Sequence, residues 1–139
     1  MSLGNGATQH STYSPGVDVD VLVVDDDEAL RFTWDAILRD AGYSVATAED
    51  GDVALRLLGV LAVGLVLLDL RMPRRDGFSV LEALTAPQLV VLVSAEILDE
   101  ATRAKVDAKV VTYLEKPVPP ERMLATVADT LRPSPAYRS

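Results

Sequence analysis

Acidic residues cluster directly after a strongly apolar stretch near the start of the chain. The stretch runs Val21-Leu22-Val23-Val24 and is followed without a spacer by Asp25, Asp26 and Asp27. Four consecutive apolar residues, three of them β-branched, are typical of a parallel strand that is buried on both faces. Carboxylates held close together repel each other, and one of them takes up a proton unless a cation neutralises the group. Because oxygen ligands suit a hard ion, the cluster predicts a Mg²⁺ site held by Asp25 and Asp26.

Three more residues with reactive side chains come at or just after the ends of other apolar runs. They are Asp69, Ser94 and Lys116. In an open α/β sheet the carboxyl ends of the strands share one edge, so these side chains should converge there with Asp25 and Asp26. A carboxylate is a competent nucleophile toward a phosphoryl group, and a metal ion and an ammonium group neutralise the attacked oxygens. The set therefore predicts phosphoryl transfer to a carboxylate, with the hydroxyl donating to a phosphoryl oxygen.

Asp69 is the predicted nucleophile, because it stands alone on its strand and faces the pair of acids after the first strand. The product would be an aspartyl-phosphate. The backbone carbonyl of Arg71 is a further candidate ligand for Mg²⁺. We assign Asp27 to capping of the helix that follows it, since aspartate is a preferred N-cap residue.

Apolar runs alternate with helical patterns along the chain. The expected strands are residues 21–24, 43–47, 63–68, 89–93 and 110–114. The expected helices run from Asp27 to Gly42, from Asp50-Gly51 onward, over about 78–84, over about 98–107, and from Pro119-Pro120 to Pro133. This alternation predicts an α/β fold in which a doubly wound, five-stranded parallel sheet is covered by five helices. The helix at 98–107 should offer mainly Ala101, Ala104 and Ala108 to the core, so it should pack thinly and move more easily than its neighbours.

The composition of the 139 residues predicts one folded domain, because 49% of them are hydrophobic. We place this domain at residues 18–132, with 1–17 as a disordered leader and 133–139 as a tail or truncated linker. A net charge of −8 argues against direct binding of nucleic acid. With no cysteine and a single histidine, His10, in the leader, thiolate and histidine metal sites are excluded. No apolar run reaches membrane-spanning length, so we expect a cytoplasmic protein without a membrane partner.

Taken together, these motifs resemble the receiver domain of response regulators in two-component signalling. The matching pieces are Val-Val-Asp25-Asp26-Asp27, Leu-Leu-Asp69-Leu-Arg-Met72-Pro73, Asp76-Gly77, Val-Ser94-Ala95 and Tyr113-Leu-Glu-Lys116-Pro117. The resemblance covers about residues 18–131. It implies a flavodoxin-like sheet with the strand order 2-1-3-4-5. It also implies a signalling domain that assists its own phosphorylation and dephosphorylation, and not an enzyme that acts on a separate substrate.

The resemblance also implies a role for each matching residue. Asp69 would be the phosphoacceptor, Asp25 and Asp26 the acid pair for Mg²⁺, Lys116 the phosphate-binding lysine, Ser94 the switch hydroxyl and Tyr113 the aromatic whose rotamer reports activation. The phosphoryl donor would be the phosphohistidine of a sensor histidine kinase or phosphotransfer protein. Phosphorylation would reshape the face formed by the fourth helix, the fifth strand and the last helix, where an output domain or partner protein would bind.

Four residues depart from the family pattern or vary within it. Lys109 and Val110 replace the Gly-Ala pair that is usual before the last strand, so we expect the exit from the helix at 98–107 to be shaped differently. Arg71 and Glu96 flank the predicted site. We expect them to pair across its mouth and to restrict the water that hydrolyses the aspartyl-phosphate.

Three other functions compete with this interpretation. A pseudo-receiver would keep the fold as a protein-interaction module without binding Mg²⁺ or taking up a phosphoryl group. A haloacid-dehalogenase-like phosphatase would use Asp25-x-Asp27, but it needs an acidic metal motif after the lysine, where only Glu121 and Asp129 remain. A flavin or nucleotide site would need Gly, Ser or backbone amides after the first strand, whereas this loop is anionic.

Overall fold

Five strands and five helices alternate along the residues described by the computed structural model, which are 16–72, 76–84, 87–95 and 98–132. They are β1 (Val19–Val24), α2 (Glu28–Asp40), β2 (Val45–Ala48), α3 (Gly51–Val60), β3 (Val63–Asp69), α4 (Gly77–Ala83), β4 (Leu89–Ser94), α5 (Glu100–Asp107), β5 (Thr112–Glu115) and α6 (Pro120–Leu131). The strands form one sheet in the order β2-β1-β3-β4-β5, and every neighbouring pair is parallel. The predicted fold and strand order are therefore confirmed. The predicted leader and tail lie outside the described residues, apart from residues 16 and 17.

The register of the sheet brings the ends of the central strands level with one another. Val24 pairs with Leu68 across β1 and β3, and Asp69 pairs with Val93 across β3 and β4. Ser94 pairs in turn with the last residue of β5. Chain segments that directly follow β1, β3, β4 and β5 therefore meet at one edge, as the sequence predicts.

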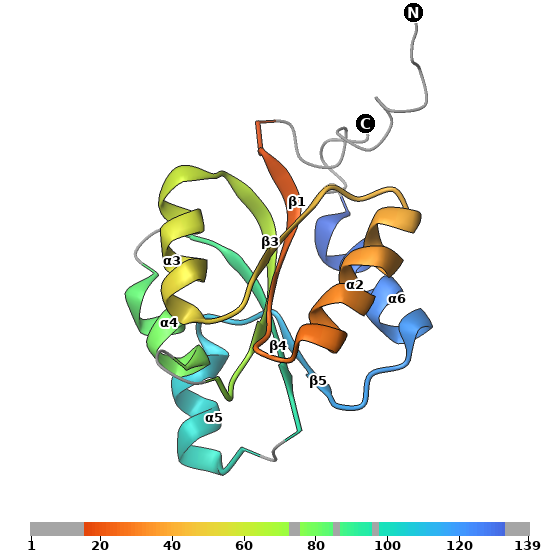
Figure 1. Cartoon of the computed structure of the whole chain (residues 1–139). Coiled ribbons are helices and arrows are strands. Elements are labelled where there is room, and N and C mark those ends of the chain that lie inside the picture. Colours follow the sequence, from red (N-terminus) through yellow and green to blue (C-terminus); the bar gives the residue numbers. More distant parts are fainter. Residues whose placement is uncertain (1–15, 73–75, 85–86, 96–97, 133–139) are drawn as a thin grey trace, which may run out of the picture.

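Each face of the sheet buries its own apolar layer (Figure 1). Helices α2 and α6 cover one face, where the buried residues are Val21, Val23, Trp34, Leu38, Leu65, Leu67, Val91, Val93, Leu114, Met123, Val127 and Leu131, together with Tyr43 and Val45. Helices α3, α4 and α5 cover the other face, which includes Leu22, Val24, Val66, Leu68, Val90 and Leu92. Successive strand residues point to opposite faces, so a strand that is buried on both sides must be apolar at nearly every position. This explains the continuous apolar runs.

Aspartates cap the N-termini of four of the described helices. The side chain of Asp27 accepts a hydrogen bond from the backbone N–H of Leu30 at 3.1 Å, which confirms its predicted role as an N-cap. Asp50, Asp76 and Asp99 cap α3, α4 and α5 in the same way. Such caps satisfy backbone donors that have no partner within the helix. None of the described helices is long and apolar enough to cross a membrane.

Helix α5 differs from the prediction in the face that it buries. The sequence predicts that Ala101, Ala104 and Ala108 contact the core, but all three are exposed. Val106 is the buried residue of this helix. The expected stripe is wrong because α5 begins only at Glu100 and turns Val106, its one apolar residue larger than alanine, toward the sheet. The prediction of thin packing is confirmed.

Candidate functional site at the carboxyl edge of the sheet

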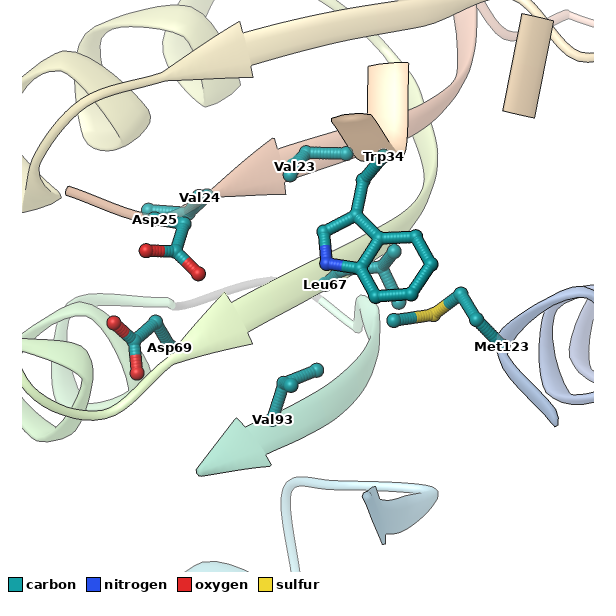
Figure 2. Close-up of a pocket in the computed structure, with 8 residues that line it drawn as sticks. All are labelled: Val23, Val24, Asp25, Trp34, Leu67, Asp69, Val93 and Met123. Atoms are coloured by element: carbon teal, nitrogen blue, oxygen red, sulfur yellow. The ribbon is translucent and has the colours of Figure 1, made fainter. Parts of the chain in front are cut away.

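Three carboxylates meet at the edge where β1 and β3 end. Asp25, Asp26 and Asp69 each present an oxygen within 4.8 Å of the other two. Asp25 and Asp69 are buried, whereas Asp26 is exposed. Strand alternation places Asp25 on the same face as Val23, and Asp69 on the same face as Leu67, so both acids lie on the side of α2 and α6. Figure 2 shows their carboxylates facing each other from the two neighbouring strands.

Lys116 is the cation at this cluster. Its Nζ donates a hydrogen bond to Asp25 Oδ2 at 3.0 Å and lies 3.5 Å from Asp69 Oδ1. Its backbone N–H donates to the carbonyl of Ser94 at 2.9 Å, which fixes the loop after β5 against the end of β4. Burial alone would lower the pKa of Lys116, but the hydrogen bonds and charges of Asp25 and Asp69 outweigh it and raise the pKa. The lysine is therefore protonated, and its positive charge lies against Asp25 and Asp69.

Asp69 is the acid that the surroundings perturb most clearly. Burial, with the negative charge of Asp25, raises the pKa of Asp69 to about 6, although Lys116 and the backbone N–H of Arg71 at 3.4 Å act in the opposite direction. The ionised form is thus costly without a further cation. Three carboxylates, an all-oxygen donor set and an excess of negative charge fit a hard divalent ion such as Mg²⁺.

Gly77 lets α4 begin directly against the end of β3. A Cβ at this position would lie 2.5 Å from the Asp69 carbonyl oxygen and 2.8 Å from the Leu70 Cα. The Gly77 N–H donates to the Leu70 carbonyl at 3.0 Å, and Asp76 caps the helix from the preceding position. The sequence indicates a loop at Asp76-Gly77, but it does not indicate that the glycine packs directly against the backbone of Asp69, the predicted nucleophile.

Arg31 is a second contributor that the sequence reasoning missed. Its Nη1 donates to the backbone carbonyl of Asp25 at 2.8 Å, from the first turns of α2. The sequence signal for this contact is a basic residue six positions after Asp25. At that separation, a long side chain on the following helix can reach the end of the strand. Arg31 therefore fixes the backbone that carries the acid pair.

Of the other predicted site residues, Ser94 and Arg71 lie at the same edge of the sheet. Ser94 is buried at the end of β4, beside the residue that pairs with Asp69. Arg71 is exposed directly after β3. Glu96 lies outside the described residues, so its pairing with Arg71 stays a prediction, as does the role of the Arg71 carbonyl.

Tyr113 does not join the cluster. It lies on β5 and packs with the apolar layer on the side of α3, α4 and α5. Its hydroxyl donates to Asp107 Oδ1 at 2.5 Å, and the guanidinium carbon of Arg103 lies 4.6 Å from the ring centroid. Burial, with the hydrogen bond to Asp107, raises the pKa of Tyr113 to about 12. In this structure the tyrosine is therefore held by α5.

Comparison with known proteins gives a consistent result. A family model described as the response regulator receiver domain matches residues 21–128. The response regulator MprA of Mycolicibacterium vanbaalenii is 38% identical over 118 residues, which are 82% of this chain and 51% of that protein. The probable transcriptional regulator ycf27 of Cyanidium caldarium is 30% identical over 81% of this chain and 46% of its own length. The chain thus spans about half the length of these relatives.

Solved structures agree with the sequence relatives. A CheY-like receiver domain from Methanospirillum hungatei superposes with a TM-score of 0.75 at 27% identity, covering 81% of this chain and 92% of that one. The chemotaxis protein CheY4 of Vibrio cholerae gives a TM-score of 0.71 at 29% identity, covering 80% and 97%.

Proposed function

The chain belongs to the response regulator receiver domain family, and from this we propose that it accepts a phosphoryl group on Asp69 in a Mg²⁺-dependent reaction. One observation carries the proposal: Lys116 Nζ lies within 3.5 Å of both Asp25 and Asp69, and a third acid, Asp26, completes the cluster. A buried carboxylate flanked by a lysine and a metal-binding acid pair is equipped to attack a phosphorus atom. A structural role alone does not require so many acids in one place.

In the proposed reaction, a carboxylate oxygen of Asp69 attacks the phosphorus of a phosphohistidine. The P–N bond breaks, and its electron pair returns to the imidazole nitrogen. Asp25 and Asp26 would hold Mg²⁺, with Asp69 and the Arg71 carbonyl as further ligands. When bound, the ion neutralises negative charge on the phosphoryl oxygens.

Two side chains would support the transferred group. The Lys116 ammonium, already within reach of Asp69, provides a fixed positive charge for a phosphoryl oxygen. Ser94, at the end of the neighbouring strand, would donate its hydroxyl to another oxygen and draw its loop toward the new charge. The aspartyl-phosphate would then be lost by hydrolysis, at a rate that Arg71 and Glu96 influence.

The proposed partners follow from the family. A sensor histidine kinase or a phosphotransfer protein would supply the phosphoryl group. The face made of α5, β5 and α6 would change shape on phosphorylation, with Ser94 and Tyr113 as the moving side chains, and would bind an output domain or a partner protein. Tyr113 supports this assignment because it joins β5 to α5 through Asp107.

Intact-mass spectrometry tests the chemistry directly. We expect the protein to gain the mass of one phosphoryl group when it is incubated with acetyl phosphate and Mg²⁺, and to gain none in EDTA. Asp69→Asn should gain none, whereas Asp129→Asn, an exposed acid on α6 that pairs with Arg132, should behave as the wild type. If the wild type binds no Mg²⁺ and gains no mass, the domain is a pseudo-receiver.

A further inference from the structure

A small pocket extends from the acid cluster down between the sheet and helices α2 and α6. Its lining residues are Val23, Val24, Asp25, Trp34, Leu67, Asp69, Val93 and Met123. Its volume is about 10 Å³, which is room for roughly one water molecule. Two carboxylates and one indole supply the polar side-chain atoms of this lining, and the other side chains are apolar (Figure 2).

Trp34 brings a polar group to this pocket that has no hydrogen-bond partner among the described residues. The residue lies on α2 and is only 6% exposed. Within the described part of the chain, its indole N–H makes no hydrogen bond. Figure 2 shows the nitrogen edge of the ring turned toward the side of the pocket where Asp25 and Asp69 lie. Buried tryptophan N–H groups normally donate to an acceptor. A buried N–H without one has lost its hydrogen bond to water, and no protein hydrogen bond compensates for that cost in free energy.

We propose that this pocket binds one ordered water molecule that accepts a hydrogen bond from Trp34 Nε1 and donates its two hydrogens to Asp25 and Asp69. The three groups match what a single water offers, which is an acceptor for the indole and two donors for the carboxylates. Three hydrogen bonds are also the usual number for a buried water. The water would join two acids that otherwise repel each other.

Trp34 would then be a positioning residue for the acid pair. Asp25 Oδ1 already accepts the Asp27 N–H at 2.9 Å and Asp25 Oδ2 accepts Lys116 Nζ at 3.0 Å, so the water would use one remaining lone pair of each acid. This arrangement keeps both carboxylates in place for Mg²⁺ before the ion arrives. The inference rests on the proposed function, since the acids are assigned there as metal ligand and phosphoacceptor, but the water itself requires no metal.

A purely structural role for Trp34 predicts a different outcome. The ring packs in the apolar layer below α2 and α6, where its shape alone could explain its presence. The two interpretations differ in whether the indole N–H is needed: the positioning role requires it, whereas the packing role requires only the shape of the ring. Because the chain has a single tryptophan, a tryptophan-auxotrophic host can replace Trp34 alone by 3-benzothienylalanine, which keeps the ring shape and exchanges the N–H for sulfur.

The test uses three proteins: the wild type, the 3-benzothienylalanine protein and Met123→Leu, which alters only the apolar wall of the pocket. Each is crystallised without metal, and each is titrated with Mg²⁺ by calorimetry. We expect a water between the indole nitrogen and both carboxylates in the wild type and in Met123→Leu. The analogue should lose or displace it and should bind Mg²⁺ about 3- to 10-fold more weakly, as for the loss of one hydrogen bond.

Absence of that water in the wild type, or an unchanged Mg²⁺ affinity in the analogue, would overturn the proposal. Failure of the wild type to bind Mg²⁺ would instead overturn the proposed function. In that case the electron density in the pocket alone decides whether the water is present.

Discussion

The ends of β1 and β3 and the flank formed by α5 and β5 are built in opposite ways. At the strand ends, the chain is buried on both faces and hydrogen-bonded to neighbours on both sides. On the flank, α5 buries one side chain, Val106, and polar contacts near its C-terminal end tie it to the rest. The difference shows where geometry must be fixed and where it can change. Reacting groups need a rigid frame, whereas a segment with few buried contacts can shift at small cost in free energy.

Lys109 illustrates how this flank is held. Its Nζ donates to the carbonyl of Leu81, in the last turn of α4, at 2.9 Å. That helix has no basic residue of its own in its last turn, so Lys109 caps it from another element. The departure from the usual Gly-Ala pair thus creates a link between α4 and the segment after α5. Lys109 thus binds the last turn of α4, whereas Gly77 is the first residue of this helix.

The largest effect should come from cavities made in the two regions. Leu65→Ala in β3, where the side chain is fully buried, should lower the free energy of unfolding by about 3 kcal/mol or more. Val106→Ala in α5 should cost only about 1 kcal/mol, because it removes fewer atoms and because Val106 is the one buried residue of a helix that can move to fill the space. Urea unfolding of both variants measures the difference. Equal losses would mean that the flank is as tightly packed as the centre.

Gly77→Ala tests the close approach of α4 to the strand end. The added methyl would meet backbone atoms of Asp69 and Leu70, so α4 must shift, at a cost of about 1–3 kcal/mol in stability. Phosphorylation of Asp69 should slow as well. Gly59→Ala is the matched control, since its methyl group would meet no atom within 4 Å and should stabilise α3 by about 0.5–1 kcal/mol. Comparable behaviour of the two variants in unfolding and phosphorylation would contradict the packing argument.

The charge on Asp69 should make the metal-free protein less stable at neutral pH. The pKa of Asp69 rises on folding from its ordinary value of 3.8 to about 6, so protons bind more tightly in the folded state. Stability from this group is therefore complete below about pH 4 and is lost as the pH rises through about 6. In EDTA at pH 7, Asp69→Asn should be more stable than the wild type by about 1–2 kcal/mol. This is less than the free energy that corresponds to the whole pKa change, because the substitution also weakens the contact with Lys116.

Denaturant unfolding at a series of pH values checks this prediction. The two proteins should be similar near pH 4 and diverge up to about pH 6, where the carboxylate ionises. Excess Mg²⁺ should narrow the difference by binding the folded wild type. A constant difference at all pH values would show that the charge is not responsible.

Asp107→Asn should have the smallest effect and should be confined to the flank. Removing the charge should lower the pKa of Tyr113 from about 12 toward its ordinary value, because the tyrosinate is no longer opposed by a carboxylate. Unfolding stability should change by less than about 1 kcal/mol, as for a partly exposed hydrogen bond. Ultraviolet titration follows all four tyrosines, so the difference between the variant and the wild type reports Tyr113. Hydrogen exchange should quicken in α5 but not in β1 or β3. Asp129→Asn, at an exposed pair, should change neither measurement.

Local patterns were sufficient to predict most of the frame and the identity of the acids. The apolar runs specify strands buried on both faces, and the alternation with helices specifies a parallel sheet. A parallel sheet then requires that Asp25 and Asp69 share an edge, whatever the register. The position of Asp27 after a strand and before a helical pattern was enough to predict its cap. These inferences depend on the chemistry of neighbouring residues and on the geometry common to such sheets.

Contacts between side chains from separate elements were decided only by the tertiary structure. The sequence could not show that Val106 instead of Ala104 faces the sheet, that Gly77 touches the backbone of Asp69, or that the Trp34 N–H opens into the pocket under the acids. Each of these depends on the rotation of a helix about its axis and on the few ångströms that separate it from the sheet. Packing of the whole core sets both quantities, and no local pattern specifies them.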